Sequence, residues 1–408
     1  MASVELQAEP ESVGLSSRQL ARVDAWRERL VAEGKLAGAT TLVMRRGKVA
    51  HLGCSGLADL ARGTPMAPDT LLRIYSMTKP LTSVALMLLY EEGLFQLDDP
   101  ITAALPCFRD MRVATGGNRA KLETEPAHRD ITYRDLLTHT SGLTYGFMNA
   151  TLVDELYRNQ GIDFQTSDRS LAALVEQAAG LPLIAQPGTA WNYSIATDVV
   201  GQLVAVLSGR DFADFLRERV LLPLGMTETD FAVPDAARPR FAANYMRGPD
   251  GRPKLIDDPE ASPFLRRRAI ASGGGGLVST AGDYLRFCRM MLNKGELDGT
   301  RLLGRKTVEL MTMNHLGGDL ASLGTPRFSE SSYDGIGFGL GFSVMLDPAR
   351  AQIAGTPGEY AWGGVASTAF WIDPAEEMAV LLLAQLTPSS TYPIRRELRV
   401  MTYAAITD

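Results

Sequence analysis

The order of periodic segments along the 408-residue chain constrains its fold most, because strand-like segments lie near both ends and helical segments fill the middle. Arg46-Gly47 and Asp373-Pro374 are turn signals, and each is flanked by short apolar segments that predict a hairpin. Strands are expected at residues 40–44, 48–52, 337–345, 368–372 and 378–384. We therefore expect one antiparallel sheet formed by both ends of the chain, in a fold of the α+β class.

The remaining periodic segments have the apolar spacing of helices. Besides the helix that follows residue 75, helices are expected at residues 17–33, 133–138, 171–179, 198–207, 212–220, 281–292 and 394–405. This order predicts two domains. Residues 1–75 and 265–408 are expected to form a domain around the antiparallel sheet, and residues 76–264 a smaller, mostly helical insertion. The active site is expected at the interface between the two domains.

The composition is typical of a soluble globular protein, with 45% apolar and 22% charged residues. A net charge of −6 argues against a nucleic acid or an anionic membrane as partner. No run of 18 apolar residues predicts a transmembrane helix. The acidic N-terminal sequence lacks the basic-then-apolar order of a signal peptide, so a cytoplasmic location is expected.

The cysteines and histidines do not predict a metal site or a disulfide framework. Cys54, Cys107 and Cys288 are scattered and odd in number, which is typical of reduced core residues. The four histidines are equally scattered, so a zinc site is not expected. No nucleotide-binding glycine motif is present, so no cofactor is expected. The sequence does not indicate an oligomeric state.

Ser76-Met77-Thr78-Lys79 begins an apolar helix. Pro80 is tolerated only in the first turn of a helix, which places the helix start near Ser76. The three-residue spacing puts the Ser76 hydroxyl and the Lys79 amine on one helix face, about one turn apart. An amine at that distance can take the proton of the hydroxyl and make it a nucleophile. The alternative is a serine near an N-cap and a solvated lysine.

A lysine alone is a poor base, because at pH 7 only about 0.04% of an ordinary lysine is neutral. A tyrosine in contact with it can share the proton, and the two then act as one base. Tyr193 is the best candidate, since it lies in a loop just before the helix at 198–207. The alternative for Tyr193 is a buried loop tyrosine.

Trp362-Gly363-Gly364-Val365 is the third element of the predicted site. The two glycines allow the backbone to approach a ligand closely, and the Val365 N–H could complete an oxyanion hole with the Ser76 N–H. The alternative is a tight turn before an edge strand. A serine–histidine triad is less well supported, because no serine has glycine at both −2 and +2. His139 is instead expected to be a structural residue, hydrogen-bonded inside a loop.

Taken together, these motifs resemble those of the family VIII carboxylesterases, within the serine β-lactamase and penicillin-binding-protein superfamily. The resemblance covers residues 12–400. It rests on S-x-x-K at 76–79, L-L-T-H-T-S-G-L at 136–143, W-x-Y-S at 191–194 with Asp198 following, the glycines at 273–276, and W-G-G-V at 362–365.

The resemblance implies a role for each of these residues. Ser76 would be the acylated nucleophile, and Lys79 with Tyr193 would be the proton-transfer pair. Trp362-Gly363-Gly364 would replace the Lys-Thr-Gly strand of β-lactamases. The backbone N–H groups of Ser76 and Val365 would form the oxyanion hole.

Two departures from the class C β-lactamase pattern indicate the substrate. Ile195 stands where those enzymes carry an asparagine that holds the lactam side chain, and Trp362 stands where they carry a lysine that attracts the carboxylate. Both changes favour an uncharged acyl or aryl ester. Ile195, Trp362, Gly363 and Gly364 are therefore expected to line the substrate pocket. Tyr145 is also a candidate pocket residue, and both Tyr145 and Trp191 are either pocket residues or core aromatics.

The expected function is therefore that of a serine carboxylesterase on short-chain or aryl esters, with at most weak β-lactamase activity. The partner is a small-molecule ester. An acyltransferase, an amidase, a β-lactamase and a non-catalytic acyl-binding scaffold remain alternatives.

Overall fold

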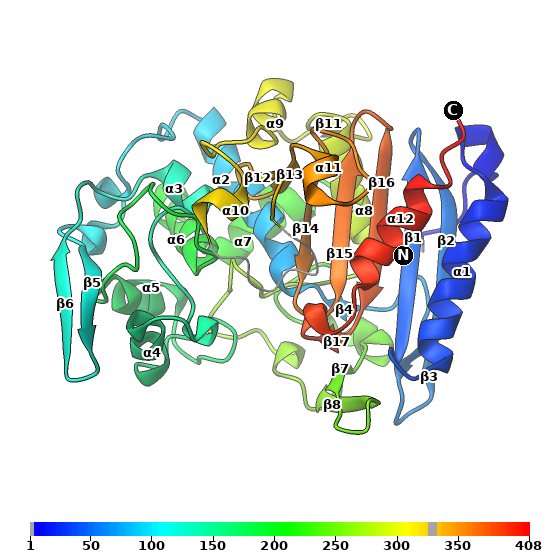
Figure 1. Cartoon of the computed structure of the whole chain (residues 1–408), viewed down its shortest axis with the longest axis horizontal. Helices are drawn as coiled ribbons and strands as arrows, with labels where there is room; N and C mark the ends of the chain where they lie inside the picture. Colours follow the sequence, from blue (N-terminus) through cyan, green and yellow to red (C-terminus); the bar gives the residue numbers. More distant parts are fainter. Residues whose placement is uncertain (1–3, 325–332) are drawn as a thin grey trace.

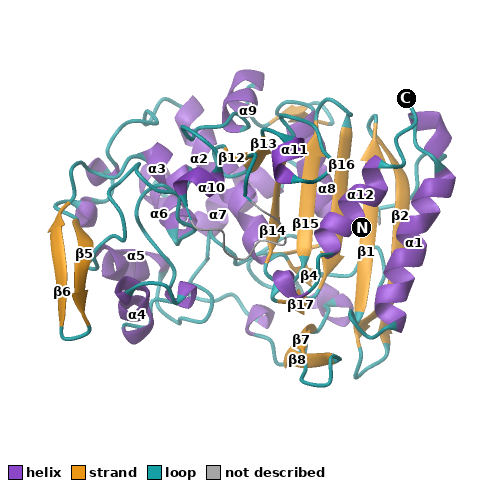
Figure 2. Cartoon of the chain, viewed as in Figure 1, coloured by secondary structure: helices purple, strands orange, loops and turns teal. Residues whose placement is uncertain are grey.

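The computed structural model describes residues 4–324 and 333–408. Its centre is an eight-stranded antiparallel sheet with the order β12-β13-β14-β15-β16-β1-β2-β3 (Figures 1 and 2). The strands are β1 (Gly38–Arg45), β2 (Lys48–Asp59), β3 (Thr64–Pro65), β12 (Ile336–Phe338), β13 (Ser343–Met345), β14 (Tyr360–Gly364), β15 (Thr368–Asp373) and β16 (Met378–Ala384). β1 pairs with β16, so the two ends of the chain meet in the middle of the sheet.

Strand β16 shows why the ends of the chain form the sheet core. All seven of its residues are buried. Leu382 packs in the cluster beneath α1 (Ser17–Ala32) and α12 (Ile394–Tyr403), whereas Leu381 packs in the main core on the other side. Helix α8 (Ala281–Leu292) covers that second face (Figure 1). A strand buried on both faces needs a continuous apolar run rather than alternation, as this sequence has.

The helices between the two strand groups gather on one side of the sheet (Figure 1). They are α2 (Thr78–Glu91), α3 (Tyr133–Leu137), α4 (Leu152–Asn159), α5 (Leu171–Ala179), α6 (Ala196–Ser208) and α7 (Phe212–Leu216). Three shorter helices follow later in the chain: α9 (Arg305–Met311), α10 (Leu320–Leu323) and α11 (Pro348–Ala351). Helix α2 is buried on every side over residues 78–89 and packs on α6. It is therefore a central element of the core rather than an amphipathic surface helix.

Short strand pairs connect these parts. β4 (Leu72–Arg73), just before Ser76, pairs with β9 (Val278–Ser279), just after the glycine run. The other small sheets are formed by β5 (Arg112–Asn118) with β6 (Lys121–Pro126), by β7 (Asn244–Arg247) with β8 (Pro253–Asp257) and β17 (Leu386–Thr387), and by β10 (Glu296–Leu297) with β11 (Thr300–Arg301). The β4–β9 pair places the serine turn and the glycine run side by side.

The predicted α+β class and the antiparallel sheet formed by both chain ends are confirmed. The single strand expected at 337–345 is wrong, because a turn with Gly341 at φ 99° divides it into β12 and β13. The hairpin of β5 and β6 was not predicted. The expectation that Cys107 is a core residue is also wrong, since its side chain is exposed. The division into two domains stays a prediction.

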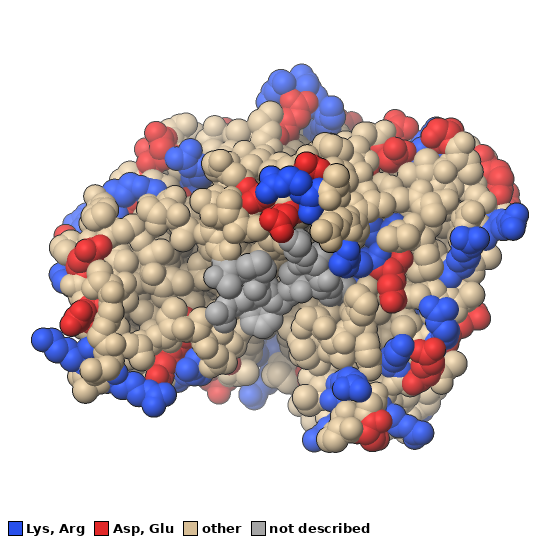
Figure 3. Space-filling model, viewed as in Figure 1, with Lys and Arg blue, Asp and Glu red and all other residues tan. Residues whose placement is uncertain are grey.

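In the described part of the chain, no helix has both the length and the apolar character needed to span a membrane. Lysine and arginine are interspersed with aspartate and glutamate over the face shown in Figure 3.

Candidate active site

Ser76 lies in a 3₁₀ turn, Tyr75–Met77, that leads directly into α2. The predicted helix start is therefore nearly right, with Ser76 just before the α-helix and Lys79 in its first turn. Tyr75 has φ 40°, in the left-handed region that costs free energy for a residue with a side chain. The Tyr284 hydroxyl donates to the Met77 carbonyl at 2.9 Å, which holds the turn from the side of α8.

Lys79 is buried, with only 2% of its surface exposed, so it is not a solvated lysine. Its Nζ lies 3.2 Å from Ser76 Oγ and donates to the Gly274 carbonyl at 2.6 Å. It also lies 4.5 Å from the centre of the Tyr193 ring. The amine is thus fixed between the nucleophile and the glycine run.

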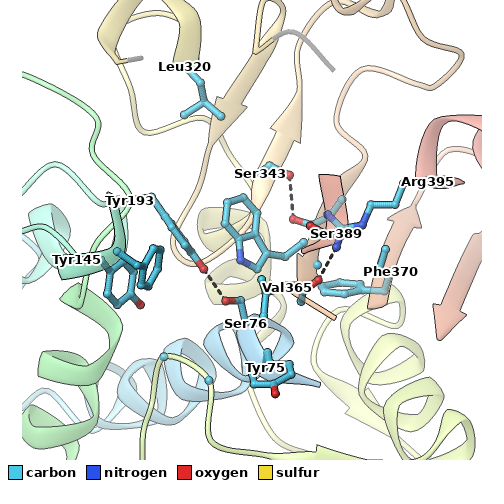
Figure 4. Close-up of a pocket in the computed structure, with 18 of the residues that line it drawn as sticks. Tyr75, Ser76, Tyr145, Tyr193, Leu320, Ser343, Val365, Phe370, Ser389 and Arg395 are labelled. Carbon is cyan, nitrogen blue, oxygen red and sulfur yellow. Dashed lines mark hydrogen bonds between the residues drawn. The ribbon is translucent and has the colours of Figure 1, made fainter. Parts of the chain in front are cut away.

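Tyr193 reaches the same serine from the loop before α6. Its hydroxyl donates to Ser76 Oγ at 2.6 Å, as the dashed line between them in Figure 4 shows. The structure therefore brings Ser76, Lys79 and Tyr193 together from segments that lie up to 117 positions apart. Two groups that can exchange protons meet at one hydroxyl, which is the geometry that proton removal from a nucleophile requires.

Asp198 binds the glycine run whose Gly274 carbonyl accepts from Lys79. The sequence motif includes Asp198 but did not predict this contact. The Asp198 carboxylate accepts from Ser272 Oγ at 2.6 Å and from the Gly274 N–H at 3.0 Å. Burial raises the pKa of Asp198, and the charge of Lys79 lowers that pKa in part. A Cβ on Gly274 would lie 2.5 Å from the Asp198 carboxylate, so the glycine run is a close-packing point.

The other wall of the site is the end of β14. A Cβ on Gly364 would lie 2.4 Å from the Ile74 carbonyl oxygen, so only glycine lets the strand approach the serine turn this closely. Val365 follows directly and is 38% exposed. Figure 4 shows it next to Ser76.

A cavity of about 920 Å³ opens over Ser76, and its lining includes Val365, Gly363 and Gly364. Aromatic residues form part of its wall, among them Tyr145, Tyr193, Tyr333 and Trp362. Four arginines line the cavity as well: Arg158, Arg395, Arg396 and Arg399. The Trp362 and Tyr193 rings lie 5.5 Å apart. Burial raises the pKa of Tyr145 well above its usual value, and the Asp198 carboxylate raises it further, so the Tyr145 hydroxyl keeps its proton. The aromatic part of the wall fits an uncharged acyl or aryl group.

Ile195 does not reach this cavity, in contrast to the prediction. Ile195 occupies the N-cap position of α6. Its side chain is 1% exposed and belongs to the main core. Trp191 is likewise buried and packs against Leu320 and Phe338 in a core cluster. His139 is buried inside its loop, where Nδ1 lies 3.3 Å from Ser194 Oγ, in agreement with a structural role.

Comparisons with known proteins agree with this architecture. A family model described as Beta-lactamase matches residues 23–404. Protein Rv1367c of Mycobacterium tuberculosis is 40% identical over 362 residues, 87% of each chain. Esterase EstB of Burkholderia gladioli is 32% identical over an alignment 415 residues long, gaps included, which covers 97% of this chain and 98% of EstB.

A solved structure described as "EstCE1, a hydrolase with promiscuous acyltransferase activity" superposes with a TM-score of 0.79 at 27% identity. The superposition covers 96% of this chain and 98% of that one. The chain belongs to the beta-lactamase family. The resemblance to the family VIII carboxylesterases found in the sequence is confirmed by the likeness to EstB and EstCE1 over nearly the whole chain.

Proposed function

We propose that this protein is a serine carboxylesterase that hydrolyses short-chain or aryl esters through an acyl-enzyme on Ser76. One observation carries the proposal: the Tyr193 hydroxyl and the Lys79 amine both contact Ser76 Oγ, at 2.6 and 3.2 Å, at a cavity with aromatic residues in its wall. The relatives named as an esterase and as a hydrolase support the same activity. The cytoplasmic location stays a prediction.

In the acylation step, Ser76 Oγ attacks the ester carbonyl while Lys79 and Tyr193 take its proton. The N–H groups of Ser76 and Val365 hold the oxyanion of the tetrahedral intermediate. The C–O bond to the alcohol then breaks, and the alcohol leaves with a proton from Tyr193.

In the deacylation step, a water molecule takes the place of the alcohol. Lys79 and Tyr193 remove its proton as it attacks the acyl carbonyl, and the bond to Ser76 Oγ breaks as the proton returns to that oxygen. The acid is released and the enzyme is restored.

The test is hydrolysis of p-nitrophenyl esters from acetate to long acyl chains, beside nitrocefin, for the wild type and Ser76→Ala. We expect fast turnover of short-chain esters that vanishes in Ser76→Ala, with little loss of nitrocefin. Trp362 offers no charge to the carboxylate of a β-lactam, and nitrocefin also tests whether the four arginines of the lining, Arg158, Arg395, Arg396 and Arg399, bind that carboxylate instead. Strong nitrocefin turnover would overturn the ester preference, and ester turnover that survives in Ser76→Ala would exclude Ser76 as the nucleophile.

Acyl transfer to an alcohol is a second candidate, and the size of the cavity favours it. A cavity of about 920 Å³ has room for an acceptor beside an acyl group, and EstCE1 is described as having acyltransferase activity. Addition of an acceptor alcohol and detection of a new ester by mass spectrometry distinguishes transfer from hydrolysis.

A further inference from the structure

Arg395, on α12, lies at the end of β14 that faces Ser76, although α12 covers the opposite face of the sheet. One of its terminal nitrogens donates to the Gly364 carbonyl at 2.6 Å and to the Thr368 carbonyl at 2.8 Å. Gly364 and Thr368 are the last residue pair of the β14–β15 ladder. The guanidinium therefore joins the ends of β14 and β15 at the point where β14 leads into residue 365. Figure 4 shows Arg395 and Val365 at this end of β14.

The two glycines of the motif serve two different contacts. A Cβ on Gly363 would lie 2.8 Å from the Arg395 guanidinium carbon, so this glycine leaves room for the arginine. A Cβ on Gly364 would lie 2.4 Å from the Ile74 carbonyl oxygen, so that glycine leaves room for the serine turn. The end of β14 is thus held between Arg395 and the turn that carries the nucleophile.

The carbonyl that Arg395 binds belongs to the same peptide group as the Val365 N–H. In a planar trans peptide the C=O and N–H bonds point in opposite directions, so an Arg395 contact on one side orients the N–H on the other. A cation on the carbonyl oxygen also polarises the peptide group and makes its N–H a stronger donor.

We propose that Arg395 is a positioning residue for the oxyanion hole, acting through the Gly364–Val365 peptide on the charge that develops in the transition state. This inference rests on the proposed function, since it requires the Val365 N–H to bind the oxyanion. Arg395 itself does not touch the reacting atoms in this scheme. Its effect is therefore larger on the tetrahedral state than on the bound ester.

The experiment compares the wild type with Arg395→Gln, Arg395→Lys and the matched control Arg301→Gln. One terminal nitrogen of Arg301 also donates to two backbone carbonyls, those of Lys294 at 3.3 Å and Leu303 at 3.2 Å, and Arg301 is not among the residues that line the cavity. We measure kcat and KM for p-nitrophenyl acetate per active site titrated with a phosphonate, and Ki for phenylboronic acid, which forms a tetrahedral adduct with a serine.

Arg395→Gln is expected to lower kcat about 10- to 100-fold with KM nearly unchanged, part of the loss seen when an oxyanion donor is removed. Ki for the boronic acid rises by the factor by which kcat/KM falls, because both report the tetrahedral state. Arg395→Lys keeps the charge but not the fixed guanidinium geometry, so it recovers part of the loss. Arg301→Gln leaves both quantities unchanged.

The inference is overturned if folded Arg395→Gln keeps the wild-type kcat/KM and boronic acid Ki per active site. It is overturned equally if Arg301→Gln shows the same loss, which would indicate a general charge effect. A purely structural role would lower Tm and the titrated fraction without changing either quantity per active site. If the wild type lacks ester turnover, the proposed function fails, and the boronic acid Ki alone then tests Arg395.

Discussion

The proton-transfer half and the oxyanion half of the site differ in the groups that form them, which are side chains in the first and backbone in the second. The proton-transfer half consists of side chains that can gain or lose protons. Lys79 and Asp198 both contact Gly274 in the glycine run at 273–276, and Tyr193 contacts Ser76. The oxyanion half consists of the backbone at the end of β14, with glycine where a side chain would collide. The first half therefore depends on the identity of side chains, and the second on backbone position, so each half is disrupted by a different kind of substitution.

The largest expected effect is on the proton-transfer half. Tyr193→Phe removes one hydroxyl and should lower kcat by about 10²–10⁴, the usual range for lost general acid–base help. Ester hydrolysis under saturating substrate measures it. Tyr392→Phe is the control. It also removes a tyrosine hydroxyl beside a lysine, since the Tyr392 ring centre lies 5.7 Å from the Lys35 amine, and it should have no effect on kcat. Near-normal turnover of Tyr193→Phe would remove this residue from the mechanism.

A smaller effect is expected from a substitution that moves only backbone. In Gly364→Ala the new Cβ would lie 2.4 Å from the Ile74 carbonyl and 2.3 Å from Thr368 Oγ1, so β14 must retreat from the serine turn. Loss of one oxyanion donor costs about 10²–10³ in kcat, and a displaced donor costs up to that.

Gly317→Ala is the control for this substitution, since a Cβ there meets nothing within 4 Å. Equal kcat and equal phenylboronic acid affinity in Gly364→Ala and wild type would show that β14 does not need its close approach.

How much of each half the sequence predicts follows from the same difference. Ser76 and Lys79 are three residues apart on a helix, so their proximity follows from helix geometry. Tyr193 was predicted because a lysine base needs a partner that shares its proton, and a tyrosine in a loop before a helix can supply it. The contact of Arg395 with Gly364 was not predicted, because it joins residues 31 positions apart and its acceptor is a backbone carbonyl. No residue type marks such an acceptor in a sequence.

The errors have physical reasons too. Ile195 was expected in the pocket because it lies two residues after Tyr193, but side-chain direction has no fixed period in a loop, and Ile195 points into the core. Residues 337–345 alternate glycine with apolar residues as a strand does, yet Gly341 adopts φ 99° and reverses the chain.

The smallest expected effect separates the two halves by their response to pH. His139 lies in the proton-transfer half, with its ring 5.0 Å from that of Tyr193. Burial lowers the pKa of His139 well below its usual value of 6.5, and the charge of Lys79 lowers it further. The unfolded chain takes up a proton near pH 6.5 while the folded protein does not. The unfolding free energy should therefore fall as the pH drops below 6.5, by at most about 1.4 kcal/mol per pH unit for this one group.

Urea denaturation between pH 7.5 and 5.5 measures that slope for the wild type, His139→Gln and His128→Gln. His139→Gln should flatten the slope, whereas His128→Gln should keep it, because His128 is exposed. Burial lowers the pKa of His51 and of His315 as well, so part of the slope remains in every variant. Asp198 acts in the opposite direction, since its raised pKa lets the folded state bind more protons than the unfolded chain above pH 3.8, and the wild type and both variants all keep Asp198. An unchanged slope in His139→Gln would mean that the buried imidazole binds its proton equally well in the folded and unfolded states, which would contradict the prediction.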